Sequence, residues 1–139
     1  MNSNEDLKIV IVISSALGIG MAANRAAVLA TGLAAHVPNM IGENLTTKDG
    51  SVLLGFTQIP IPILSLKPEL SFYELVKKSK ELGCQSLVYL TRAQGLRSYE
   101  EYKDSIAQTN DLDLDIDGMA VWGDKKLVNK IVGSLPSLR

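Results

Sequence analysis

The fold of this chain is decided by residues 8–35, which read KIVIVISSALGIGMAANRAAVLATGLAA. The run Lys8–Ile13 is rich in β-branched residues, which is typical of a strand buried on both faces of a sheet. The turn Ser14–Gly20 follows, and the alanine-rich sequence from about Met21 to Ala35 predicts a helix that lies close against that sheet. This order predicts an α/β domain in which backbone N–H groups at a helix start are presented at the end of a buried strand.

The remainder of the chain alternates between strand-like and helix-like segments. Capping-box patterns at Ser71 and Ser98 predict two helix starts, and Gly83 ends the first of these helices. Pro60 and Pro62 indicate that the adjoining strand lies at a sheet edge or begins after a bend, because proline cannot donate to a ladder. We expect a loop at Pro38–Lys48 and strands at Ser51–Thr57, Ile61–Leu66, Ser86–Leu90 and Asp117–Trp122. Helices are expected at 71–82 and 98–108, and Lys125–Val132 is a last short helix or a turn. The predicted fold is a three-layer α/β sandwich with a mixed sheet of four to five strands, formed by residues 1–139 as one domain.

Composition restricts the class of protein. With 139 residues, of which 46% are hydrophobic and 21% charged, the chain resembles an ordinary soluble globule. The net charge of −1 and the pI of about 5.8 supply no field that recruits nucleic acid, so nucleic acid is not expected as a partner. Cys84 is the single cysteine, which excludes an intrachain disulfide and makes a reduced, cytoplasmic compartment the default expectation. We expect Cys84 to be a buried structural thiol, because no histidine lies nearby in the sequence to activate it.

The apolar stretch near the N-terminus lacks the features of a membrane or secretory segment. Glu5 and Asp6 precede it with Lys8 as the one positive charge, which is the wrong sign for a signal peptide. Asn24 and Arg25 interrupt the apolar run, and a central arginine costs about 2.5–3.5 kcal/mol on insertion scales. We therefore expect no membrane association.

Three aspartates, Asp113, Asp115 and Asp117, precede Gly118 at a spacing similar to that of an EF-hand calcium loop, and Asp124 occupies the twelfth position. Apolar residues alternate with these aspartates, whereas a calcium loop carries polar residues there and closes on a bidentate glutamate. We interpret the segment as a polar turn that leads into a buried strand, with the aspartates facing solvent.

The single histidine, His36, is expected to cap the C-terminal end of the first helix. The chain has no cluster of histidine and cysteine of the kind that binds zinc or iron, and no Ser-His-Asp arrangement is visible. No metal or cofactor is therefore expected, and no residue is assigned a catalytic role.

Two segments are candidates for a ligand-binding crevice: the turn after the first strand, and Thr91–Arg97 after the strand Ser86–Leu90. If these strands are parallel, both segments lie at the carboxyl edge of the sheet, where α/β proteins place ligands. Arg92 and Arg97 could hold an anion there, although arginines on a solvated loop are an equally good interpretation. Asn24 is expected to point its amide into the crevice, because asparagine is a poor helix former. The predicted ligand is a small or anionic molecule, and the predicted ligand-binding residues are Ser14, Ser15, Gly18, Gly20, Asn24, Thr91, Arg92 and Gln94.

Several short motifs resemble known families over nearly the whole chain. Met21–Asn24 is similar to the G-K-x-A-A-Q segment of the second class of peptidyl-tRNA hydrolases. Three further segments are similar to the C-terminal half of that family: Lys80–Gly83, Gly118–Gly123 and Val128–Leu135. The chain more closely resembles a domain-of-unknown-function family, numbered two thousand, in its first strand, its helix start and its Tyr-x-x-Tyr helix at Tyr99–Tyr102. These resemblances imply a peptidyl-tRNA-hydrolase-like fold.

The chain departs from the hydrolases at functional positions. Gly18–Gly20 stand in place of a basic residue, and Asn24 replaces a glutamine. Ala27 replaces a histidine, and Thr91–Gln94 replace an Asp-Ala-Gly segment. The resemblance therefore implies the fold without the activity. Our first hypothesis is a protein that binds a small or anionic ligand in its crevice. The alternatives are a hydrolase of peptidyl-tRNA or a related ester, and an oligomeric structural module, such as a homodimer, whose crevice is vestigial.

Overall fold

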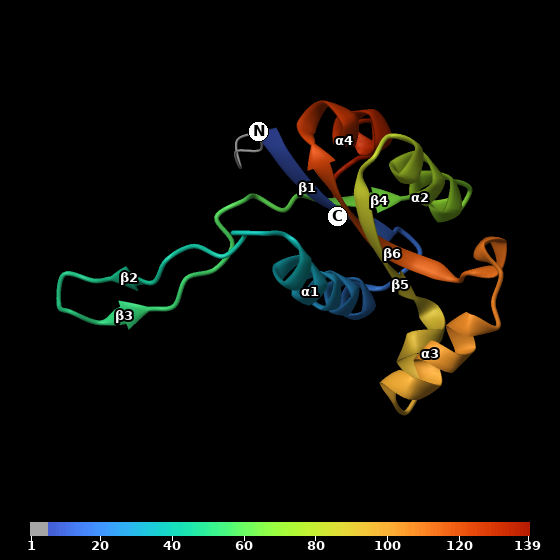
Figure 1. The fold of residues 1–139 in the computed structure, drawn as a ribbon, viewed down its shortest axis with the longest axis horizontal. Coiled ribbons are helices and arrows are strands. Elements are labelled where there is room, and N and C mark those ends of the chain that lie inside the picture. The colour runs from blue at the N-terminus through green and yellow to red at the C-terminus, as the bar shows by residue number, and fades with distance from the viewer. Residues whose placement is uncertain (1–5) are drawn as a thin grey trace.

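The computed structural model describes residues 6–139, which contain a four-stranded mixed sheet with helices on both faces (Figure 1). The strand order is β4-β1-β6-β5, with β1 at Leu7–Ser14, β4 at Ile63–Leu66, β5 at Gln85–Leu90 and β6 at Ile116–Asp124. β1 pairs parallel with β4 and antiparallel with β6, and β6 pairs antiparallel with β5. β1, β4 and β5 therefore run in the same direction, and their carboxyl ends share one edge of the sheet with the start of β6.

Helices form the two outer layers. α1, Ile19–His36, packs on one face of the sheet, while α2, Phe72–Glu81, and α4, Lys125–Val132, pack on the other (Figure 1). α3, Tyr99–Ala107, belongs to neither layer and lies in the connection between β5 and β6, beyond the end of the sheet. The predicted α/β architecture with a mixed sheet is confirmed, at four strands. None of the helices within residues 6–139 is both long and apolar enough to span a membrane.

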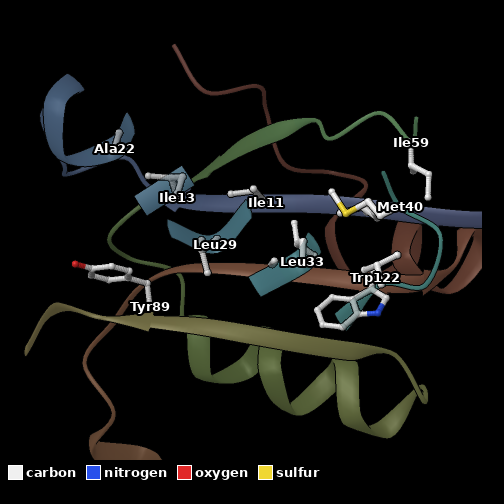
Figure 2. Packing of buried hydrophobic residues seen from close by; sticks show 12 residues of the cluster. Ile11, Ile13, Ala22, Leu29, Leu33, Met40, Ile59, Tyr89 and Trp122 are labelled. Carbon is white, nitrogen blue, oxygen red and sulfur yellow. The ribbon is translucent and has the colours of Figure 1, made fainter. Parts of the chain in front are cut away.

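The hydrophobic core has one half on each face of the sheet. Ile9, Ile11 and Ile13 of β1 point toward α1, whereas Val10 and Val12 point toward α2 and α4, because successive residues of a strand face opposite sides. Figure 2 shows the first half, in which leucines of α1 lie between the isoleucines of β1 and aromatic rings of the neighbouring strands. All five residues are at most 2% exposed, so the predicted burial of this strand on both faces is confirmed.

Local capping fixes the helix boundaries. Ser71 Oγ accepts a hydrogen bond from the backbone N–H of Glu74 at the start of α2, and Ser98 Oγ accepts one from that of Glu101 at the start of α3. Gly83 takes a φ of 76° just after α2, a conformation that glycine adopts without strain. The predicted starts of both helices and the stop at Gly83 are therefore confirmed.

Residues 41–57 form a hairpin, hereafter the arm, that projects away from the sheet (Figure 1). In the arm, β2 at Leu45–Thr46 pairs antiparallel with β3 at Val52–Leu53 as a separate two-stranded sheet. The predicted strand Ser51–Thr57 is therefore wrong as a strand of the main sheet, and the predicted loop Pro38–Lys48 contains a strand. The reason is physical: β-branched residues favour extended backbone, but they do not specify which strand pairs with them.

β4 is an edge strand that begins after Pro62, as the prolines predict. Its outer side is covered by the C-terminal segment: Ser65 N donates to Pro136 O at 2.8 Å, and Leu138 N donates to Ile63 O at 2.9 Å. The C-terminal segment thus lies beside β4, close to the start of α1.

Candidate functional site

The turn after β1 and the 3-10 helix η2, Thr91–Gly95, lie at the same edge of the sheet, because β1 and β5 run in the same direction. The start of β6, with Asp117, lies between them, and Arg25 of α1 reaches the same point. Arg25 is 1% exposed and Asp117 is 7% exposed. The space between the two predicted segments is therefore occupied by a buried ion pair.

The Arg25 guanidinium binds the Asp117 carboxylate through two hydrogen bonds. Nε donates to Oδ1 at 3.0 Å, and Nη2 donates to Oδ2 at 2.8 Å. The guanidinium carbon also lies 4.3 Å from the centroid of the Tyr89 ring, so the cation stacks on an aromatic face. The hydrogen bond to Asp117 raises the pKa of Arg25 against the opposing effect of burial, so the side chain stays cationic.

Three predicted ligand-binding residues complete this network. Gln94 Oε1 accepts from Arg25 Nη2 at 2.8 Å, and Asn24 Oδ1 accepts from Arg25 Nη1 at 3.3 Å. Thr91 Oγ1 donates to Asp117 Oδ2 at 2.9 Å. Within residues 6–139, every fully buried side-chain nitrogen or oxygen has a hydrogen-bond partner. The structure thus brings Asn24, Thr91 and Gln94 together, but their polar atoms serve the ion pair.

Sequence reasoning did not find the partner of Arg25, and it assigned no role in the site to Asp117 or Tyr89. The expectation that the aspartates face solvent is wrong for Asp117, because the start of β6 is covered by α1. Two signals were available: Arg25 is the one charge inside an apolar helix, and Asp117 directly precedes the apolar run of β6. The two residues are 92 positions apart, so no local pattern reveals that they pair.

Arg92 of η2 forms hydrogen bonds to α3 and to the segment between α3 and β6. Its Nε donates to Asp115 Oδ1 at 2.6 Å and its backbone N–H donates to Asp115 Oδ2 at 2.7 Å. Nη1 donates to Ser105 Oγ of α3 at 3.1 Å and to Thr109 Oγ1, just after α3, at 2.6 Å. An anion would have to compete with Asp115 for this guanidinium, so ligand binding by Arg92 stays a prediction.

The start of α1 is open. Gly18 is the N-cap residue, with a φ of −68°, and it has no side chain that could accept from the first turn. A Cβ added at Gly18 or Gly20 would meet nothing within 4 Å among residues 6–139, so packing does not require glycine there. The first turn also contains no acidic residue. The N–H groups of this turn therefore lack a side-chain cap.

A cavity of about 720 Å³ lies beside this helix start, hereafter the α1–β4 cavity. It is bounded by the turn after β1, the first half of α1, β4 and the C-terminal segment. Most lining residues are small or apolar: Ser15, Leu17, Ile19, Ala22, Ala23, Ala26, Ile63, Ser65, Pro136, Ser137, Leu138 and Arg139. Its volume lies within the range of about 300–1,000 Å³ that is usual for ligand sites. The cavity is on the β4 side of α1, whereas the predicted crevice is on the β5 side.

The eight predicted residues therefore do not converge on one cavity. Ser15 lines the α1–β4 cavity, whereas Ser14 lines a separate cavity of about 260 Å³ near α2, together with Lys67 and Tyr73. Gly18 and Gly20 lie at the start of α1, and the other four residues belong to the two arginine networks. A role for each of them in binding a ligand stays a prediction.

The remaining candidates have structural explanations. Cys84 is buried as predicted, and burial raises the pKa of its thiol, with Asp124 as a smaller cause, which disfavours the reactive thiolate. His36 is the last residue of α1, but the C-cap residue is Val37, whose backbone N–H donates to Leu33 O, so capping by His36 stays a prediction. In the calcium-like segment, Asp115 binds Arg92 and Asp117 binds Arg25, so two of its carboxylates already have cationic partners.

Comparison with known proteins agrees with this fold. No curated protein matches the chain. A solved structure that is similar to it is that of the protein of unknown function Atu0240 from Agrobacterium tumefaciens strain C58, with a TM-score of 0.85 and 21% sequence identity. The match covers 95% of this chain and 97% of that chain, and at this identity it shows the fold alone. The likeness to the peptidyl-tRNA hydrolases stays a prediction. A family model matches residues 7–139, and the chain therefore belongs to the family described as protein of unknown function (DUF2000).

Proposed function

We propose that this protein binds a small molecule, with an apolar body and an anionic group, in the α1–β4 cavity. The observation that carries the proposal is that a cavity of ligand size adjoins the uncapped start of an 18-residue helix. The predicted ligand was a small or anionic molecule; the proposal combines the two properties and moves the site to the other side of α1.

The helix sequence makes room for the apolar body. Ala22 and Ala26 are one turn apart on α1 and therefore share a face, and both line the cavity. Ile63 and Leu138 line the cavity from β4 and the C-terminal segment. A larger residue at the alanine positions would fill the space in which the ligand body lies.

The anionic group has donors available at one end of this cavity. The free N–H groups and the macrodipole of α1 favour a negative charge at its start, a preference worth about 0.3–1 kcal/mol. Ser15 and Ser65 contribute hydroxyls, and Arg139 contributes a cation. Glycine at position 20 leaves the helix start open to close approach.

The test uses two fluorescent probes that differ by one charge. 1-Anilinonaphthalene-8-sulfonate carries a sulfonate, and N-phenyl-1-naphthylamine is its neutral counterpart. We expect both probes to bind the wild-type protein and Ala26→Leu to weaken both at least tenfold, because the new side chain occupies the cavity. The matched control is Ala30→Leu, one turn further along α1, at a half-buried alanine that does not line the cavity.

Two outcomes would contradict the proposal. One is equal weakening by Ala26→Leu and Ala30→Leu, which would indicate a general effect on the helix. The other is a failure of either probe to bind the folded wild-type protein. Circular dichroism of each variant, recorded beforehand, separates loss of the cavity from loss of the fold.

A hydrolase of peptidyl-tRNA or a related ester is the second candidate. The observation in its favour is the hydroxyl of Thr91, which donates to the Asp117 carboxylate at the edge of the sheet. Arg25 binds both oxygens of that carboxylate, so the Asp117 carboxylate is poorly placed to take a proton from a water molecule. We expect no release of free tRNA from an N-blocked aminoacyl-tRNA. Turnover that disappears in Thr91→Ala would favour the hydrolase instead.

A further inference from the structure

The arm exposes apolar side chains on both of its faces. The register is fixed by the pair Leu45–Leu53 near the tip and by the bridge Ile41–Thr57 at the base. Side chains alternate along each strand, so every second residue shares a face. One face carries Ile41, Leu45 and Leu53, and the other carries Val52, Leu54 and Phe56.

Such a surface is unusual for a segment surrounded by water. Leu54 is 81% exposed and Phe56 is 80% exposed. Glu43 is the one charged residue along the two legs of the arm, because Lys48 and Asp49 lie at its tip. An isolated two-stranded hairpin is also marginally stable at best, and contiguous apolar surface usually marks an interaction site. The arm is therefore expected to pack against a partner.

The outer face of α1 has the same uncharged character. Surface helices normally present charged side chains to solvent. In the 18 residues of α1, the only basic side chains are Arg25, which is buried, and His36 at the end, and no residue is acidic. Val28 is 44% exposed, and Asn24, Thr31 and Ala35, which share its face of the helix, are also exposed and carry no charge. This face therefore suits an apolar partner.

We propose that the partner is a second copy of this chain: the arm of each copy lies along the outer face of α1 of the other. α1 leads through Val37–Met40 directly into the arm, so both surfaces are adjacent in each copy (Figure 1). A two-fold axis near this junction lays each arm over the helix of the other copy and makes both contacts identical.

The dimensions of the two surfaces agree. An 18-residue helix is about 27 Å long, and each six-residue leg of the arm is about 20 Å long. A standard interface buries about 800 Å² of each partner. The arm supplies large apolar side chains for such an interface, because Leu54 and Phe56 on one of its faces are each about four-fifths exposed.

The test is sedimentation equilibrium of the full chain at micromolar concentrations. We expect the wild-type protein to be dimeric. The arm variant Leu54→Asp/Phe56→Asp and the helix variant Val28→Asp should each weaken dimerisation at least a hundredfold, because each buries a carboxylate against apolar surface. The control is Leu112→Asp, which changes an equally exposed leucine on neither surface and should leave the dimer intact.

Mixing the two variants distinguishes this arrangement from arms that pair with each other. The intact arm of the helix variant then meets the intact α1 of the arm variant, so the mixture should form a dimer with half of the contacts. A monomeric wild-type protein would overturn the proposal, as would a dimer that Val28→Asp leaves unchanged. None of the substituted residues lines the α1–β4 cavity, so failure here leaves the proposed ligand site untouched.

Discussion

The two flanks of α1 use their polar groups in opposite ways. Toward β5 and β6, Arg25 and Asp117 are buried and bound to each other, with Gln94 and Thr91 bound to the pair. Toward β4, a cavity of about 720 Å³ is lined mainly by alanine, serine and apolar residues. The flank with the charges holds an ion pair whose polar atoms bind one another, and the flank with the cavity has few charges. In this protein, charge at a strand end therefore does not mark the α1–β4 cavity.

The difference follows from the cost of burying charge. A guanidinium and a carboxylate lose their hydration when α1 packs on the sheet, so each needs a complete set of partners inside the fold. A ligand that took the place of Asp117 on Arg25 would leave this carboxylate buried without its cationic partner. We therefore assign this pair to holding α1 against β6 and η2, and the following predictions test that division of roles.

The largest expected effect is that of removing one member of the ion pair. Asp117→Ala leaves Arg25 charged and buried, which should lower the free energy of unfolding by about 3–5 kcal/mol. Urea denaturation monitored by circular dichroism measures this loss. The control is Arg25→Met/Asp117→Leu, which removes both charges and should recover most of the stability. A loss below about 1 kcal/mol in Asp117→Ala, the size expected of an exposed pair, would contradict the structural role.

A smaller effect is expected for the second arginine. Arg92→Met removes the bonds to Asp115 and Thr109 at a partly exposed site and should cost about 1–2 kcal/mol. The affinity for 1-anilinonaphthalene-8-sulfonate should be unchanged, because Arg92 does not line the α1–β4 cavity. If Arg92→Met had normal stability but no longer bound the probe, the result would indicate that the ligand site lies on the β5 flank of α1.

Gly20→Ala should change stability and binding in opposite directions. Alanine is the better helix former and meets nothing at this position, so the unliganded protein should gain about 0.5–1 kcal/mol. The added methyl group should hinder an anion at the start of α1 and weaken the sulfonate probe more than its neutral counterpart. Equal effects on both probes would show that the anionic group binds elsewhere.

The smallest effect concerns Cys84, on the opposite face of the sheet from the α1–β4 cavity. Burial raises its pKa above the usual 9.0, so the thiol ionises first in the unfolded chain. The free energy of unfolding should therefore fall as the pH rises above about 9, and part of this fall should be absent in Cys84→Ala. Urea titrations at pH 8 and pH 10 measure it. An identical pH dependence in the two proteins would argue against this burial.

The sequence predicts the parts of the fold that depend on local patterns. The apolar run of β1 and the serine caps of α2 and α3 each follow from a few neighbouring residues. The arm could not be predicted, because Leu45 and Val52 favour extended backbone but do not specify which strand pairs with them. The pairing of Arg25 with Asp117 depends on how α1 crosses the sheet, and this long-range geometry has no counterpart in local sequence.

The candidate site was predicted as a single crevice, whereas the structure divides the predicted residues between two arginine networks, the start of α1 and two separate cavities. The alanines at positions 22 and 26 are the sequence signal of the α1–β4 cavity, although alanines on a helix also fit close packing against a sheet. Whether these alanines line a cavity or pack closely depends on β4 and the C-terminal segment, which lie opposite them only in the folded chain.

The most direct test of the division between the two flanks is a crystal structure of the protein with 1-anilinonaphthalene-8-sulfonate. We expect the aromatic rings between Ala26 and Ile63, the sulfonate at the backbone N–H groups that begin α1, and an unchanged Arg25–Asp117 pair. A probe bound to Arg25 or Arg92, with its carboxylate partner displaced, would contradict the account.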